Sequence, residues 1–280
     1  MIATSKIFLP DYLRMRLRRW FLSQGVALIL VCSATLGAVR GSAQPAALSP
    51  PALDQLVARI ALYPDPLLAQ ILTASTYWNE IPAAAGWADQ HSYLKGDALA
   101  NAIKADNLQW DPSLLALLPF PSVLDMMARD MAWTGQLGNA VLTQRKAVMD
   151  AVQRMRRKAI DYGYLQSNSY ERVVSDGEYL QILPVQPELV YVPYYDPLVV
   201  FSRPAITGAI RFGPGITIGA GFAPWGWTGP GFLWPSSTIV IDRHPWERVW
   251  VNRGAYVHPY AHPWIHAVGP RIERHDFPRR

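Results

Sequence analysis

Apolar residues recur at intervals of three and four from residue 49 to residue 162, which is the periodicity of helices buried along one face. Three dipeptides in this stretch, Ser49-Pro50, Asp65-Pro66 and Asp111-Pro112, join a helix-capping residue to proline, which favours the first helical position. A helix is therefore expected to begin at each, and the longest candidate covers residues 136–160. The pattern predicts a bundle of helices in the N-terminal half.

Beyond this stretch the apolar period shortens to two, which indicates strands. Asp176-Gly177 lies between two such segments and is a strong signal for the tight turn of a β-hairpin. The expected strands cover residues 170–174, 178–183, 188–192 and 198–201. We expect an α+β fold in which an N-terminal helical bundle packs with a small antiparallel β-sheet. This domain covers residues 52–202 and follows a Pro/Ala/Ser linker over residues 44–51.

Residues 203–280 differ in composition from the rest of the chain. They contain ten glycines, ten prolines, six of the 11 tryptophans and five of the six histidines. A Gly/Pro content of this size is typical of segments that form little regular structure. We therefore expect a Gly/Pro/Trp/His-rich tail of low order after the folded domain.

Residues 1–43 have the three parts of a secretory signal peptide. A basic region precedes an apolar stretch over residues 26–39, and the small residues Gly41-Ser42-Ala43 predict cleavage before Gln44. The run Arg18-Arg19-Trp20-Phe21-Leu22 resembles the twin-arginine export motif, so the general and the twin-arginine routes are both open. An uncleaved N-terminal anchor is the alternative. The leader predicts a periplasmic or secreted protein.

Charge and cysteine content exclude several classes of function. The whole chain carries a net charge of +5, but the leader holds six basic residues and one acid, so the remaining chain is neutral. A neutral chain is a poor match for nucleic-acid binding, which needs a cationic face. Cys32, the one cysteine, also lies in the leader. Disulfides, thiolate metal sites and cysteine nucleophiles are therefore not expected after cleavage.

The tail histidines are the candidate metal ligands. His258, His262 and His266 are spaced by four, which would place the imidazoles on one helical face, but Pro259 and Pro263 disfavour a regular helix there. An irregular loop could gather the three rings around a divalent transition metal such as Zn²⁺, Cu²⁺ or Ni²⁺. The alternative is a His/Pro/Tyr-rich surface segment. No other cofactor is indicated.

The tail tryptophans are the candidate binding residues: Trp225, Trp227, Trp246, Trp250 and Trp264. Exposed aromatic rings contact an envelope protein or a cell-wall polymer through their apolar faces. The same rings could instead hold the Gly/Pro-rich tail onto the core. A basic run at residues 154–158 is either a solvated helix end or a contact with an anionic surface, including peripheral contact with a membrane.

Motifs for catalysis are absent from residues 44–280. The sequence contains no G-x-S-x-G elbow, H-E-x-x-H pair or phosphate-binding loop. Carboxylate pairs such as Glu171 and Glu178 occur, but the sequence alone does not place any two at the separation that glycosidases need. A non-enzymatic protein is favoured, and an envelope hydrolase with a site between the helices and the sheet is an alternative.

Several phrases of the chain resemble, in the same order, an uncharacterised bacterial envelope family, the domain of unknown function 3300. The resemblance covers about residues 50–202. The phrases are residues 53–70, Trp110-Asp111-Pro112-Ser113, Asp130-Met131-Ala132-Trp133, residues 148–153 and residues 190–197. The resemblance implies an exported location and carries no reaction. We expect an exported cell-envelope protein that acts as a non-enzymatic interaction or structural module. Two alternatives stand beside this expectation. One is the envelope hydrolase, and the other is a periplasmic metal-binding protein that uses the tail histidines.

Overall fold

The computed structural model describes residues 43–259, and the expected signal peptide lies almost wholly outside them. Residues 45–280 group into one unit by their contacts, and the fold below is that of the part of this unit that the structure describes. Its helices are α2 (Pro50–Val57), α3 (Asp65–Ala74), α4 (Ile81–Gln90), α5 (Gly96–Ala105), α6 (Pro112–Leu117), α7 (Pro121–Arg129), α8 (Met131–Asp161) and α9 (Pro197–Val200), with 3₁₀ segments η1 (Ser75–Glu80), η2 (Ala220–Trp225) and η3 (Trp234–Ser236). With its small antiparallel sheets, this confirms the α+β class.

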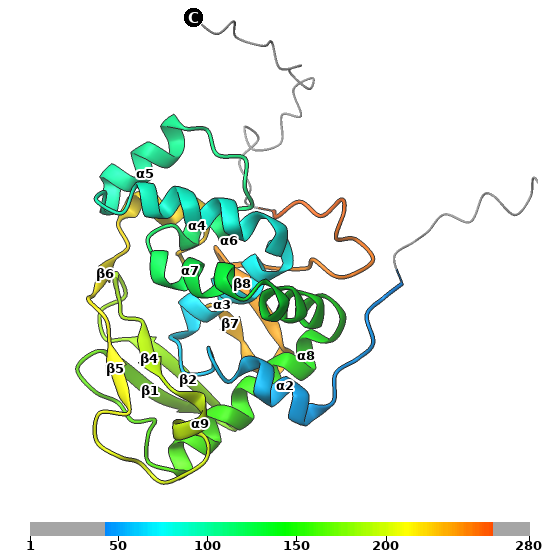
Figure 1. The fold of residues 1–280 in the computed structure, drawn as a ribbon, viewed down its shortest axis with the longest axis vertical. Helices are drawn as coiled ribbons and strands as arrows, with labels where there is room; N and C mark the ends of the chain where they lie inside the picture. Colours follow the sequence, from blue (N-terminus) through cyan, green and yellow to red (C-terminus); the bar gives the residue numbers. More distant parts are fainter. Residues whose placement is uncertain (1–42, 260–280) are drawn as a thin grey trace, which may run out of the picture. The chain divides into compact units, whose positions relative to one another are not determined.

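The long helix α8 organises the helical part. α2 and η1 both pack along it, and Figure 1 shows α2 beside α8. Its buried residues include Val141, Val148 and Val152, which form part of the expected apolar stripe. Each large apolar side chain withdrawn from water in this way stabilises the fold by about 1.5–3 kcal/mol. No helix among the described residues is both long enough and apolar enough to cross a membrane.

α8 is interrupted at Gln144, whose backbone (φ −148°, ψ 45°) is not helical. The interruption releases carbonyl oxygens from the helical hydrogen-bond ladder. The carbonyl of Leu142 accepts a hydrogen bond from the backbone N–H of Trp250 at 3.1 Å. Arg145 adds hydrogen bonds to the carbonyls of Trp246 and Arg248, at 2.9 and 2.6 Å. The interruption in α8 is therefore the place where a C-terminal segment docks.

Four small antiparallel sheets complete the described fold. The strands are β1 (Glu171–Asp176), β2 (Tyr179–Pro184), β3 (Leu189–Val190), β4 (Pro193–Tyr195), β5 (Ile210–Phe212), β6 (Ile216–Thr217), β7 (Phe232–Leu233), β8 (Thr238–Ile241) and β9 (His244–Pro245). β1 and β2 form the expected hairpin, in which Gly177 supplies the left-handed backbone of the turn (φ +61°). The strand expected at residues 198–201 is wrong. α9 forms there, because Pro197 sits at its first position and Asp196 accepts a hydrogen bond from the Leu198 N–H.

The tail is more ordered than its composition predicts, up to the end of the described residues. β3 pairs with β6 and β4 with β5, so the sheets extend across residue 202. β7 and β8 pack beside α3 (Figure 1). Trp225, Trp234 and Trp246 are at most 3% exposed. The tail is ordered because its aromatic side chains bury apolar area against helices more than 100 residues away, which offsets the backbone freedom of glycine.

Candidate functional site

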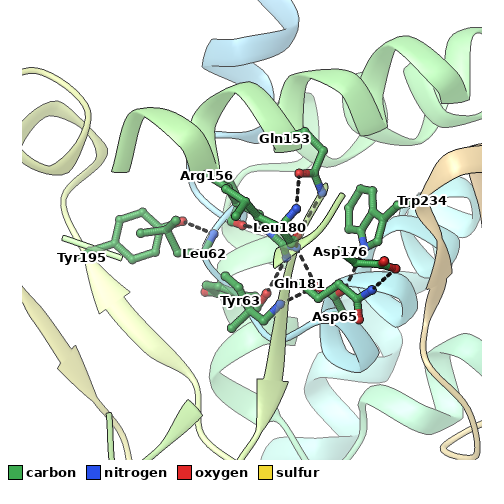
Figure 2. Close-up of polar contacts among 12 residues, drawn as sticks. Leu62, Tyr63, Asp65, Gln153, Arg156, Asp176, Leu180, Gln181, Tyr195 and Trp234 are labelled. Carbon is green, nitrogen blue, oxygen red and sulfur yellow. Dashed lines mark hydrogen bonds and ion pairs between the residues drawn. The ribbon is translucent and has the colours of Figure 1, made fainter. Parts of the chain in front are cut away.

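The motif Tyr63-Pro64-Asp65-Pro66 lies at a buried polar centre formed around Arg156 (Figure 2). The Arg156 side chain is fully buried, and its Nη1 lies 2.7 Å from Oδ1 of Asp65. The same guanidinium donates hydrogen bonds to the carbonyl oxygens of Ala61, Tyr63 and Leu180 at 2.7–3.1 Å. A buried charge needs this degree of pairing because water no longer solvates it.

Asp65 serves this centre instead of capping its helix, which corrects the capping role that the sequence suggests. Pro64 occupies the capping position of α3. The Asp65 carboxylate accepts hydrogen bonds from Nε1 of Trp234 at 2.8 Å and from the Ile182 N–H at 3.3 Å. Burial raises the pKa of Asp65, and the charge of Arg156 opposes that shift. The carboxylate therefore joins α3, α8, β2 and η3 at one point.

Gln153 and Tyr195 extend the centre on either side. The Gln153 side chain accepts a hydrogen bond from the Leu180 N–H at 2.8 Å and donates one to the Leu180 carbonyl at 3.0 Å. The Tyr195 hydroxyl donates to the Ala58 carbonyl and accepts from the Leu62 N–H, and burial raises its pKa. These groups bond to the protein itself and lie away from solvent. The centre is a structural junction between the helices and the hairpin.

Glu171, at the start of β1, is the one buried carboxyl of the described chain whose oxygen Oε2 has no hydrogen-bond partner there. Burial raises its pKa to about 8, while the charge of Arg156 acts in the opposite direction. The side chain therefore holds a proton at neutral pH. Glu171 faces Pro184 across the hairpin, whereas Glu178 lies at the turn, so the two do not form an acid–base pair.

The structure places one of the three candidate metal ligands. His258 is 4% exposed, and burial lowers the pKa of its imidazole to about 3, with a contribution from His244. His262 and His266 lie outside the described residues. Within residues 43–259, no group of three or more His, Cys, Asp or Glu side chains is placed to hold a metal ion. The three-histidine centre stays a prediction.

The four candidate binding tryptophans that the structure describes do not share an exposed surface. Trp225 and Trp246 are buried, which corrects their assignment as contact residues, because a buried ring cannot reach a partner. Trp227 is half-buried against Phe120 and donates to the Ala116 carbonyl at 2.9 Å. Trp250 is also half-buried, and Trp264 lies outside the described residues. The described rings fasten the tail to the helices, which was the alternative interpretation.

Exposed aromatic side chains instead lie on and beside the ribbon formed by β3–β6 and β4–β5. Tyr170 and Tyr194 are 39% and 45% exposed. The Tyr170 ring lies 4.5 Å from that of Phe212 and 4.9 Å from that of Tyr191. Exposed aromatic groups of this kind mark binding surfaces because they bury large areas at little entropic cost. We call Tyr170, Tyr191 and Phe212 the aromatic strip. Tyr194 lies on the other side of the ribbon, because it follows Pro193, the strand partner of Phe212.

A β-bulge shapes one end of the strip. Three residues, Gly213-Pro214-Gly215, separate Phe212 from Ile216, whereas two residues separate their strand partners Pro193 and Val190. The ribbon therefore contains one extra residue on this side, as in a β-bulge. A Cβ at Gly213 would lie 2.9 Å from the ring of Tyr194. At Gly215 it would lie 2.9 Å from the ring of Tyr191. Glycine at both positions therefore lets the two tyrosine rings approach the backbone of the ribbon closely.

Beside the bulge lies a cleft of about 360 Å³, which we call the tyrosine cleft. Its walls come from α5, α7 and the ribbon, and include Leu99, Pro121, Ser122, Tyr194, Pro214 and Ile216. The Tyr194 hydroxyl donates to Oγ of Ser122 at 3.0 Å, which holds the ring across the cleft. Lys95 is the one charged residue among the described lining. The cleft offers apolar contact and a few hydrogen-bonding groups, but no carboxylate or imidazole from the described lining.

The sequence phrase over residues 190–197 contains Tyr191 and Tyr194, yet the exposure of Tyr194 is visible only in the structure. The alternation of glycine with apolar residues after Phe212 was the available signal for the bulge.

The side chains of the basic run at residues 154–158 lie in different environments. Arg154 pairs with Asp54 at 2.6 Å, and Arg156 points into the core.

Comparison with known proteins gives a family but no activity. A family model described as a protein of unknown function, DUF3300, matches residues 49–244. The uncharacterized protein YacH of Escherichia coli (strain K12) is 32% identical over 187 residues, which cover 55% of this chain and 30% of that protein. The chain thus matches less than a third of this relative's length. No solved structure matches it. The matched residues include the Arg156 centre and the tyrosine cleft.

Proposed function

The chain belongs to the DUF3300 family of proteins of unknown function, and from this premise we propose that it is an exported cell-envelope protein that binds another envelope protein without catalysis. The aromatic strip and the tyrosine cleft form the binding surface. The observation that carries the proposal is the exposure of Tyr194 on a ribbon that borders a preformed cleft, with the exposed Tyr170 packed on Phe212 of the same ribbon. The leader sequence supports export.

The cleft suits an extended, uncharged polypeptide segment. Grooves lined by aromatic rings recognise proline-containing extended chains, because such chains lose little conformational freedom on binding. Tyr194 supplies the ring, and Pro121 and Pro214 supply rigid apolar walls. Ser122, Thr217 and Lys95 can bond to the backbone carbonyls of the segment. A partner segment of low charge would leave few charges unpaired in the cleft.

In-cell cross-linking of a tagged chain tests the proposal. Wild type is expected to give a discrete envelope adduct, and the double variant Tyr170→Ala/Tyr194→Ala is expected to lose it. Tyr93→Ala is the matched control, because Tyr93 is 74% exposed and lies outside the strip and the cleft. The absence of any adduct in wild type, or an adduct that survives the double variant, would refute the proposed surface.

The two alternative functions have their own tests. A hydrolase between helices and sheet would need an acid–base pair in the tyrosine cleft, and its described lining provides none. Release of fragments from purified cell wall by the chain would contradict the non-enzymatic proposal. Metal analysis of the purified chain, with a His258→Ala/His262→Ala/His266→Ala variant as control, tests the metal-binding alternative.

A further inference from the structure

A second surface, separate from the tyrosine cleft, lies where residues 45–48 pass over the first half of α8. It is a groove of about 390 Å³, within the ~300–1,000 Å³ typical of small-molecule sites. We call it the amide groove. Its lining includes Pro45, Leu48, Trp78, Gln136, Asn139 and Gln144. We propose that the amide groove binds a neutral sugar ring of an envelope glycan.

Trp78 provides an aromatic platform at the groove. The side chain is 43% exposed, in contrast to the buried tryptophans of the tail. Its position is fixed by a close crossing of η1 over α8. A Cβ at Gly138 would lie 2.0 Å from the Ser75 carbonyl oxygen, and one at Gly135 would lie 3.6 Å from the Trp78 ring. A sugar ring has one apolar C–H face, and an exposed indole supplies the flat apolar surface that such a face packs against.

Most polar side chains of the groove are amides, and they lie along the first half of α8. Gln136, Asn139 and Thr143 are spaced by three and four, so they line the same side of the helix. Neither Gln136 nor Asn139 uses its side-chain amide to bond to another described residue. Amides carry both donors and acceptors, which is the combination that sugar hydroxyls require.

Gln144 supplies an independent observation that points to a ligand. Its Nε2 is buried and has no hydrogen-bond partner among the described residues. It lies at the interruption of α8, where its backbone departs from the helix. A buried amide without a partner destabilises a fold, so its presence beside a groove indicates a group that a ligand satisfies. Rotation of the Gln144 side chain toward the groove would let a ligand hydroxyl accept a hydrogen bond from this Nε2.

The lack of charged residues in the groove restricts which polar ligands it can bind. Every described residue that lines it is uncharged. A phosphate or carboxylate ligand would find no cation there, and burial of an unpaired charge is strongly unfavourable. A neutral polyhydroxylated ring with one apolar face satisfies the indole and the amides together. This inference is independent of the tyrosine cleft, which lies on other elements.

Titration calorimetry of the purified chain with chitotriose and with maltotriose tests the inference. Binding of either neutral oligosaccharide supports it, and the one that binds tells whether the units are N-acetylated. Trp78→Ala is expected to weaken binding about 10-fold or more, as for a central aromatic contact. The exposed-tyrosine variant Tyr93→Ala is the control and should bind as wild type does.

Gln144→Met separates binding from folding, because methionine has a similar volume and no buried polar group to satisfy. The variant is expected to be at least as stable as wild type to urea and to bind the oligosaccharide more weakly. A purely structural Gln144 would show the opposite pattern, with lower stability and unchanged binding. The inference is overturned if neither oligosaccharide binds wild type, or if Trp78→Ala and Gln144→Met both bind as wild type does.

Discussion

Replacement of Glu171 by glutamine tests the electrostatics of the buried centre. Burial raises the pKa of this carboxyl from 4.5 to about 8 in the folded chain. The groups that face it are Arg156, whose charge lowers that pKa, and Tyr195, whose own pKa is raised in part by Glu171. Gln keeps the shape of the neutral carboxyl and cannot ionise, so Glu171→Gln removes the titration with little change in packing.

The direction of the pH effect follows from the two pKa values. Below about pH 4.5 both the folded and the unfolded chain hold the Glu171 proton, so this residue gives stability no pH dependence. Between about pH 4.5 and 8 the unfolded chain has lost the proton and the folded chain retains it, so stability falls as the pH rises. The slope is about 1.4 kcal/mol per pH unit. The whole shift therefore corresponds to an upper limit of about 5 kcal/mol.

Urea unfolding of wild type and Glu171→Gln over this pH range measures the effect. The variant is expected to gain stability relative to wild type by several kcal/mol between about pH 5 and about pH 8. Glu178→Gln, at the exposed turn of the same hairpin, should leave the wild-type pH dependence unchanged. Parallel curves for wild type and Glu171→Gln would show that Glu171 ionises normally in the folded chain and would refute the reasoning.

Three further substitutions test the packing, each by urea unfolding. Asp65→Ala leaves a buried guanidinium unpaired and should cost about 3–5 kcal/mol, and a loss below about 1 kcal/mol would contradict the buried ion pair. Gly138→Ala drives a Cβ into a backbone oxygen and should destabilise by about 1–3 kcal/mol, whereas Gly86→Ala, with open space around it, should be neutral or stabilising. Trp246→Ala should cost about 3–5 kcal/mol if the tail is part of the core, against no more than about 0.5 kcal/mol for the exposed Val251→Ala.

Local patterns in the sequence predicted the local structure. The Ser-Pro and Asp-Pro pairs fall at the starts of α2, α3 and α6, and Asp-Gly falls at the hairpin turn. The apolar stripe of α8 also indicated that one charged residue is buried. Arg156 lies four residues after Val152 and three before Ala159, so it shares the apolar face with them. Its charge suggested solvent, but its position in the period indicated burial.

The long-range features could not be predicted from local patterns. The partners of Asp65 lie 91 and 169 residues further along the chain, at Arg156 and Trp234. Composition predicted low order for the tail, because glycine and proline are common there. Burial of Trp225 and Trp246 depends on surfaces that exist only after the helices have assembled. The exposure of Tyr194 depends equally on the bulge beside it, so neither set of rings could be assigned to core or surface beforehand.

The bond between Trp234 and Asp65 has a consequence for the order of events during synthesis. A nascent chain that ends before residue 234 contains every helix from α2 to α9 but lacks the indole that caps the Asp65–Arg156 pair. It also lacks β8, which pairs with β7 and packs beside α3. The helical part therefore cannot complete its core until residues 234–241 have been synthesised. Its final folding has to wait for contacts of long sequence separation, which slow folding and leave the helices with exposed apolar surface in the meantime.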